Sequence, residues 1–365
     1  MEPMDMDFSQ TPKSGQDDSQ ARPDNTIRQY QDTAYNSDDF SPQKARVEQG
    51  FLRRMITKGK LFGFSKTTDA IAVSAIDDVT PEVMAEYEAD YESDGKSMYW
   101  DEKTLSSESF SGWSQVYLVI AALAKVCLIG FLPLFYVFCL IGLFFGKGGV
   151  VFGWNDGWSD IFLGTAFFAV LPCLLISGHF KLVDSGHYYL APFLQSKRVF
   201  EMNRTTGMVT LFKRNKPYFT HPFIEFDCVL LSSPTRQGFL NYSLTLIHRY
   251  SNYSVGVPLD SLLGPNAMVD EYLRFWNMVQ RYMDISQPLP DIMILEDARK
   301  RDPTTIAYDK EHNRNPRYWR DMTEEEYAQK LKMLKTEQKS IPATGKPIDI
   351  FKGPNTANPV KKKKK

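Results

Sequence analysis

The apolar stretches VYLVIAALAKVCLIGFLPLFYVFCLIGLFF at 116–145 and IFLGTAFFAVLPCLLISG at 161–178 decide the fold of this chain. The first contains a single charge, Lys125, and the second contains none. A helix needs roughly 20 apolar residues to cross the hydrocarbon core of a bilayer, and the core helices of soluble proteins are rarely apolar for so long. Tryptophans stand before both stretches, as is typical of a membrane interface. We therefore predict a transmembrane hairpin with spans at 113–146 and 158–179.

The same hairpin is also compatible with a transporter or channel component. Lys125 is the one ionisable group inside the spans, and intramembrane charges often mark an ion pathway. A lysine near a helix end usually extends its ammonium group to the headgroups, however. Pro133 and Pro172 would kink the helices, which membrane proteins tolerate when neighbouring groups satisfy the freed carbonyls. We therefore favour a membrane anchor and keep transport as an alternative.

The distribution of cations predicts the orientation of the hairpin. The link between the spans carries one lysine, whereas cations are frequent in residues 46–66 and again after the second span. Because lysine and arginine favour the cytoplasmic side, we expect both termini in the cytoplasm and a small external loop. Four scattered cysteines without metal-binding spacing fit a reducing compartment, and they predict no metal site and no cofactor. The net charge of −1 gives no general attraction to nucleic acid.

Two polar regions precede the hairpin. Residues 1–45 are poor in apolar side chains, and this composition predicts disorder. Residues 46–112 form a charged juxtamembrane region, which is basic as far as residue 66 and acidic from residue 69. Apolar residues of the basic part follow helical spacing. This part is therefore either an amphipathic segment on anionic lipid or an ordinary folded face.

Residues 180–285 predict a β-rich domain that is closed by a helix. The strands RVFEMNR and MVTLFKR are joined by TTG, in which Gly207 supplies the positive φ of a tight turn. Further apolar strands follow within 222–259. An amphipathic helix then places Tyr272, Phe275 and Trp276 on one wide apolar face. The predicted fold class is an α+β membrane protein, in which the hairpin carries a small antiparallel barrel or sandwich with a closing helix.

The order of these elements, with the hairpin FEMNRTTGMVTLFKR, resembles the pleckstrin-homology-like (PH-like) domains of bacterial membrane proteins. This resemblance covers the β-rich domain alone, and it implies a PH-like fold for residues 180–285.

A second resemblance covers roughly residues 110–330. It rests on LPDIMILEDARKRDPTTIAYDKEHNRNPRYWRDM at 289–322, together with the hairpin and the two spans. These features are similar to an uncharacterised group of proteobacterial inner-membrane proteins, whose members occur near type VI secretion genes. The similarity implies a multi-pass protein of the bacterial inner membrane, with the context of a secretion accessory or immunity protein. It implies no established activity.

Three segments follow the closing helix. Residues 286–322 form a strap rich in proline and aromatic residues, 323–339 a helix capped by Thr323, and 340–365 a lysine-rich tail. The aromatic residues of the strap either pack on the preceding domain, which is the favoured interpretation, or bind a partner. The candidates for contact with a protein partner are Arg317, Tyr318, Trp319 and Arg320.

Anionic lipid headgroups are the alternative ligand, and cations of the β-rich domain would bind them. The candidates are Lys197, Arg198, Arg204, Lys213 and Arg214. If these cations share one face beside the membrane, that face would favour a lipid-headgroup sensor. Dispersed cations would favour a protein-binding module.

Sequence motifs of common enzymes are absent. The chain contains no GxSxG, HExxH, Walker or GxGxxG pattern, and its five histidines are scattered along the sequence. We therefore predict a non-enzymatic integral membrane protein that presents a cytosolic module to a protein partner. Lipid-headgroup sensing and transport are the alternatives.

Overall fold

Eight short strands form two antiparallel sheets among the residues that the structure describes, and neither sheet closes into a barrel. The computed structural model describes residues 30–46, 50–77, 79–85, 87, 100–145, 163–194, 196–234, 240–263 and 268–354. The first sheet has the order β1-β6-β7-β8, from Lys60–Phe62, Phe226–Pro234, Leu240–His248 and Val257–Pro258. The second has the order β2-β3-β4-β5, from Thr104–Ser109, Lys197–Asn203, Met208–Lys213 and Lys216–Pro222. The predicted α+β class is confirmed, and the predicted barrel is not observed.

The β3–β4 hairpin has the predicted strands and turn. Phe200 of β3 pairs with Leu211 of β4, and Gly207 in the turn has φ 70°. A Cβ atom at Gly207 would lie only 2.3 Å from the carbonyl oxygen of Thr33. Glycine is therefore required both for the left-handed backbone and for the close approach of the N-terminal segment.

Both sheets include a strand from the region before the two apolar helices. Leu61 of β1 pairs with Val229 of β6, and Ser109 of β2 pairs with Lys197 of β3. The domain therefore extends beyond 180–285, and part of the predicted juxtamembrane region 46–112 lies inside it. The boundary was wrong because β1 and β2 are short edge strands, whose partners lie far away in the sequence.

The basic segment before β1 is an ordinary folded face. Helix α1, at Gly50–Lys58, packs its apolar residues Phe51 and Met55 against Val229 and Ile247 of the first sheet. Its apolar side is therefore occupied by the domain. The alternative of an amphipathic segment lying on lipid is wrong for this helix.

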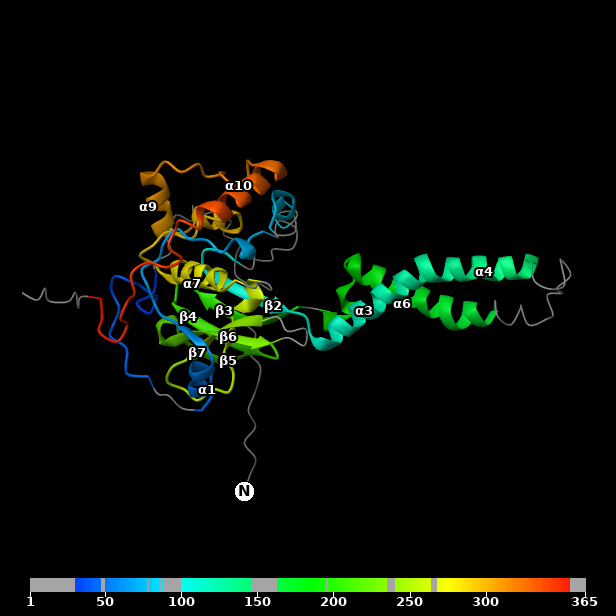
Figure 1. The fold of residues 1–365 in the computed structure, drawn as a ribbon, viewed down its shortest axis with the longest axis horizontal. Helices are drawn as coiled ribbons and strands as arrows, with labels where there is room; N and C mark the ends of the chain where they lie inside the picture. Colours follow the sequence, from blue (N-terminus) through cyan, green and yellow to red (C-terminus); the bar gives the residue numbers. More distant parts are fainter. Residues whose placement is uncertain are drawn as a thin grey trace, which may run out of the picture.

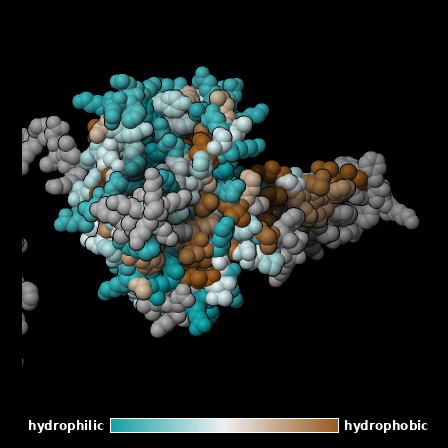
Figure 2. Space-filling model, turned by 60° about the vertical axis from the view of Figure 1, so that its left-hand side comes forward, coloured by the Kyte–Doolittle hydropathy of each residue, from teal (hydrophilic) through white to brown (hydrophobic). Residues whose placement is uncertain are grey.

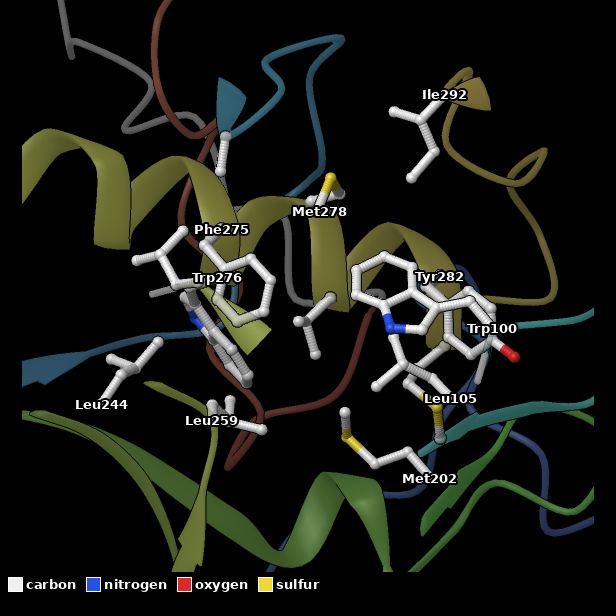
Figure 3. Close-up of a cluster of buried hydrophobic side chains, with 14 of the residues drawn as sticks. Trp100, Leu105, Met202, Leu244, Leu259, Phe275, Trp276, Met278, Tyr282 and Ile292 are labelled. Carbon is white, nitrogen blue, oxygen red and sulfur yellow. The ribbon is translucent and has the colours of Figure 1, made fainter. Parts of the chain in front are cut away.

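Helix α7, at Val269–Met283, closes both sheets as predicted. Figure 3 shows Trp276 facing Leu244 and Leu259, while Tyr282, farther along the helix, lies near Leu105 and Met202 of the second sheet. Trp276 is fully buried, and its indole N–H donates to the carbonyl oxygen of Gly63 over 2.9 Å. The predicted start of this helix near Asn266 lies outside the described residues.

Short helices form a layer over α7 (Figure 1). They are α8 at Glu296–Arg299, α9 at Pro303–Glu311 and α10 at Glu324–Glu337. Asp302 caps α9 by accepting the Thr305 N–H over 3.0 Å, and Thr323 forms a capping box with Glu326. The strap predicted at 286–322 thus contains short helices joined by turns, and the predicted cap of the last helix is confirmed.

The ends of the described chain also pack on the domain. Tyr35 is 4 % exposed, and its carbonyl oxygen accepts the Ile285 N–H. Ile348 donates its N–H to the Phe64 carbonyl oxygen over 2.9 Å, and Ile350 is buried. Residues 30–46 are therefore ordered, in contrast to the predicted disorder of 1–45, and the predicted tail at 340–365 packs on the domain as far as residue 354. Residues 1–29 and 355–365 lie outside the described residues.

Two apolar helices project from the domain as a stem (Figure 1). They run over Gly112–Ile141 and Leu163–Asp184, and both are long and apolar enough to cross a membrane. Their parts are α3 at Gly112–Val126, η2 at Cys127–Phe131, α4 at Leu132–Phe145, η3 at Ala166–Val170 and α6 at Leu171–Asp184. Figure 2 shows a mainly hydrophobic surface on the stem and a mainly hydrophilic one on the domain.

The two stem helices have the same local irregularity. A five-residue π-helical segment ends two residues before Pro133 in the first helix and two residues before Pro172 in the second. Such segments relieve the loss of the proline N–H inside an apolar helix. The helices contact each other through α3 and α6, where Ala121 and Ala124 are buried.

Candidate functional site

Five cations lie at one end of the second sheet. β3 begins there, β4 ends there and β5 begins there, so the antiparallel pairing alone brings these strand ends together. The guanidinium carbon of Arg198 lies 5.7 Å from the ring centroid of Phe212, which confirms that the β3 and β4 ends are adjacent. We call this group the basic rim, and it consists of Lys197, Arg198, Lys213, Arg214 and Lys216.

The basic rim is held beside the stem by strand pairing. Lys197 pairs with Ser109, the last residue of β2, and Ser111 then caps helix α3. Exposed aromatic residues lie at the same level, with Trp113 79 % exposed in the first turn of α3. Aromatic side chains of this kind mark the zone of lipid headgroups. The rim is therefore placed where headgroups would lie if the stem spans a bilayer.

The turn between β4 and β5 has an unusual backbone. Arg214 and Asn215 both have positive φ, at 52° and 61°, as a two-residue hairpin turn requires. Glycine or asparagine normally occupies such positions, and arginine pays a steric penalty there. The strained conformation presents Arg214 at the tip, and strain of this kind concentrates at functional sites.

An open hollow of about 510 Å³ lies beside this turn. It is lined by Lys213, Arg214, Lys216, Pro217 and Tyr218. The Lys213 ammonium lies 5.5 Å from the ring centroid of Tyr218. Within the described residues, no carboxylate forms an ion pair with Lys213, Arg214 or Lys216. The hollow therefore offers uncompensated positive charge to an anionic ligand.

Arg204 does not belong to this surface. It lies at the opposite end of β3, is fully buried, and pairs with Asp302 over 2.9 Å. It also donates to the carbonyl oxygens of Asp284 and Gln287, over 2.9 and 2.8 Å. Burial raises the pKa of Asp302, but the charge and hydrogen bonds of Arg204 outweigh burial and hold that pKa below its usual range. Its prediction as a headgroup ligand is wrong, because this arginine ties β3 to the end of α7 and to α9.

The four partner-binding candidates are divided between the interior and the surface. Trp319 is buried and donates its indole N–H to Asp291 over 2.8 Å, and Arg320 pairs with Asp297 over 2.8 Å. These two residues hold the strap, which is the interpretation that the sequence favoured. Arg317 is exposed and pairs with Asp321, and Tyr318 is about one-third exposed. Only these last two remain accessible to a partner.

A cluster that the sequence did not indicate lies where the two sheets meet. The imidazole rings of His221 on β5 and His248 on β7 stack with their centroids 3.8 Å apart. Glu225 lies between the strands, and its Oε2 is 3.0 Å from Nε2 of His248 and 3.9 Å from Nδ1 of His221. Tyr253 completes the cluster, with its hydroxyl 3.0 Å from Nε2 of His221. We call these four residues the histidine cluster.

Two imidazoles and a carboxylate could in principle hold a transition metal, since their ligand atoms lie within 4.8 Å of one another. The hydrogen bonds argue against this. The Ser251 N–H donates to Nδ1 of His248 over 3.0 Å, so the ring proton is on Nε2, which faces Glu225. A metal would need the lone pair of Nε2. The cluster is thus built for hydrogen bonding.

Comparison with protein-family models, with curated proteins and with solved structures gave no match. The functional argument therefore rests on the geometry of the basic rim and of the histidine cluster.

Proposed function

We propose that the protein is a non-enzymatic membrane anchor that carries a cytosolic PH-like module, and that the basic rim of this module binds anionic lipid headgroups. The observation that carries the proposal is the pairing of Lys197 with Ser109, because it fixes the rim next to the start of the stem. Four of the five predicted headgroup cations share this end of the sheet. The antiparallel strands of residues 197–258, followed by the closing helix α7, are what motivates the PH-like part of the proposal.

The same pairing supports the proposed topology. β2 precedes the stem and β3 follows it, and because they pair, both ends of the stem lie on one side of a membrane. The bias of lysine and arginine makes that side the cytoplasm. An inner-membrane location and a secretion-associated partner follow from the resemblance alone. The exposed residues Arg317 and Tyr318 are where such a partner would bind.

Transport is less well supported by the stem. Lys125 is exposed on the outer surface of the helix pair, whereas small residues face the other helix. Its ammonium group therefore does not line a path between the two helices.

Native mass spectrometry of the full chain in detergent would test headgroup binding, with phosphatidylglycerol and phosphatidylcholine added in equal amounts. The rim variant combines Lys213→Gln, Arg214→Gln and Lys216→Gln. A cation near anionic lipid contributes about 1 kcal/mol, so the three together contribute up to about 3 kcal/mol. We expect the affinity for phosphatidylglycerol to fall by up to about 100-fold, while the affinity for phosphatidylcholine stays unchanged.

A matched control removes the same charge elsewhere, through Lys310→Gln, Lys332→Gln and Lys339→Gln on the exposed surface near α9 and α10. This control should bind phosphatidylglycerol like the unmodified chain. An equal loss in both variants would mean that only net charge matters, and no loss in the rim variant would refute the proposal. Soluble glycerol phosphate that binds as tightly as the lipid would make a free phosphate compound the ligand.

A further inference from the structure

The histidine cluster holds a loop that borders the basic rim. Residues 249–256 connect β7 to β8, and Tyr253 of this loop stacks on Phe219 with ring centroids 4.6 Å apart. Its ring also lies 5.8 Å from that of Tyr218, which lines the hollow of the rim. Tyr253 of the histidine cluster thus contacts Tyr218 at the edge of the hollow beside the basic rim.

The stacked imidazoles cannot both carry a charge without strong repulsion. Two positive rings at a centroid distance of 3.8 Å would repel each other in a partly buried site. His248 is further constrained, because a proton on its Nδ1 would face the Ser251 N–H that now donates to that atom. Protonation of His248 therefore removes the hydrogen bond that fixes the start of the loop.

The groups around the pair do not reverse this preference. Glu225, from the connection between β5 and β6, is the one carboxylate in contact with both rings among the described residues. Tyr250 and Tyr253 face His248 from the loop. Arg249 is nearby and pairs with Asp227 on β6 over 3.1 Å, but Asp227 also pairs with Arg46 over 2.7 Å, so the positive charge that remains there likewise disfavours protonation of the rings. Burial, followed by the neighbouring His248, lowers the pKa of His221 although Glu225 opposes them.

We propose that the stacked pair of His221 and His248 is a proton-sensitive latch, which holds the 249–256 loop and Tyr253 against the basic rim when both rings are neutral. Because the folded state disfavours protonation, the latch is fully stabilising above the ordinary histidine pKa of about 6.5. Its contribution is lost as the pH falls below that value. The loop then opens and uncovers Tyr218 at the edge of the hollow. This regulatory role rests on the proposed function of the rim, whereas the latch itself does not.

Hydrogen exchange of the full chain in phosphatidylcholine nanodiscs tests the latch without any anionic lipid, so its outcome is independent of headgroup binding. Exchange times are corrected for the intrinsic effect of pH. Between about pH 7.5 and about pH 5.5, opening that releases one histidine of pKa 6.5 becomes roughly tenfold more favourable. We expect peptides that cover 216–222 and 249–256 to lose roughly that protection, while peptides of α7 do not change.

Three variants make the test specific. His248→Gln keeps a donor for Glu225 and an acceptor for the Ser251 N–H, so its loop should stay closed at both pH values. His221→Gln removes the ring repulsion and should reduce the response. His187→Gln, at an exposed histidine near the stem, should respond like the unmodified chain. An unchanged loop between the two pH values, a response that persists in His248→Gln, or protection that depends on added Zn²⁺ would overturn the latch.

Discussion

Replacing Arg204 by methionine distinguishes an internal tie from a headgroup ligand. The substitution keeps a long apolar stem but removes every hydrogen-bond donor of the guanidinium. Asp302 would then remain 1 % exposed and without its cation. The carbonyl oxygens of Asp284 and Gln287 would also lose a donor. We therefore expect a large loss of stability and no specific loss of lipid binding.

The size of the loss follows from burial. Removing one partner of a buried ion pair typically costs about 3–5 kcal/mol, because the other charge stays uncompensated. For a domain of about 150–250 residues, each kcal/mol shifts the melting temperature by about 2–4 °C. Arg204→Met should thus melt about 6–20 °C below the unmodified chain. Arg198→Met is the control on the same strand, since Arg198 is exposed and its pair with Glu201 is worth about 1 kcal/mol or less.

Scanning fluorimetry of the full chain in detergent would measure both variants over a range of pH. The stabilisation by ionised Asp302 is complete above its unfolded pKa of about 3.9, and it is lost as the pH falls through the lowered folded pKa. The difference between the unmodified chain and Arg204→Met should therefore shrink below about pH 4. If Arg204→Met melts no lower than Arg198→Met at neutral pH, the interpretation of Arg204 as a buried tie is wrong.

Two further substitutions test the packing of the domain. Gly207→Val should lower the free energy of unfolding by more than the roughly 1–2 kcal/mol that a left-handed residue costs, because its Cβ would also meet the Thr33 carbonyl oxygen at 2.3 Å. A melting temperature equal to that of the unmodified chain would exclude this contact. Trp276→Ala should cost about 3–5 kcal/mol, and a chain with Trp276 as its one tryptophan should show blue-shifted emission without lipid. Emission that resembles that of water-exposed tryptophan would contradict the burial of this residue.

The features that local sequence determines were predicted well. Uniform hydropathy identified the two apolar helices, which need no partner to be recognised. The turn at Gly207 and the apolar face of α7 around Trp276 were also predicted, because a hairpin and an amphipathic helix are each encoded within about twenty residues. Four rim cations were named from composition, and antiparallel pairing was enough to bring them together.

The features that depend on distant contacts were missed. β1 and β2 are stabilised by β6 and β3, so their short sequences alone do not indicate strands. The local sequence does not distinguish Arg204 from the exposed Arg198 of β3. Arg204 is buried because the fold places Asp302 beside it. His221 and His248 share no local motif, because their contact arises where two different strands meet.

The pairing of β2 with β3 also sets the order of events during biosynthesis. The N-terminal strands β1 and β2 leave the ribosome before the stem, whereas their partners β6 and β3 are translated after it. If the stem spans a bilayer, neither sheet can be completed until the second helix has been inserted and the chain has returned to the same side. Until then, two strand edges stay unpaired, a state that is prone to aggregation. Under the proposed function, insertion of the stem would therefore be a step within the folding of this domain, and a defect in either helix would leave both sheets incomplete.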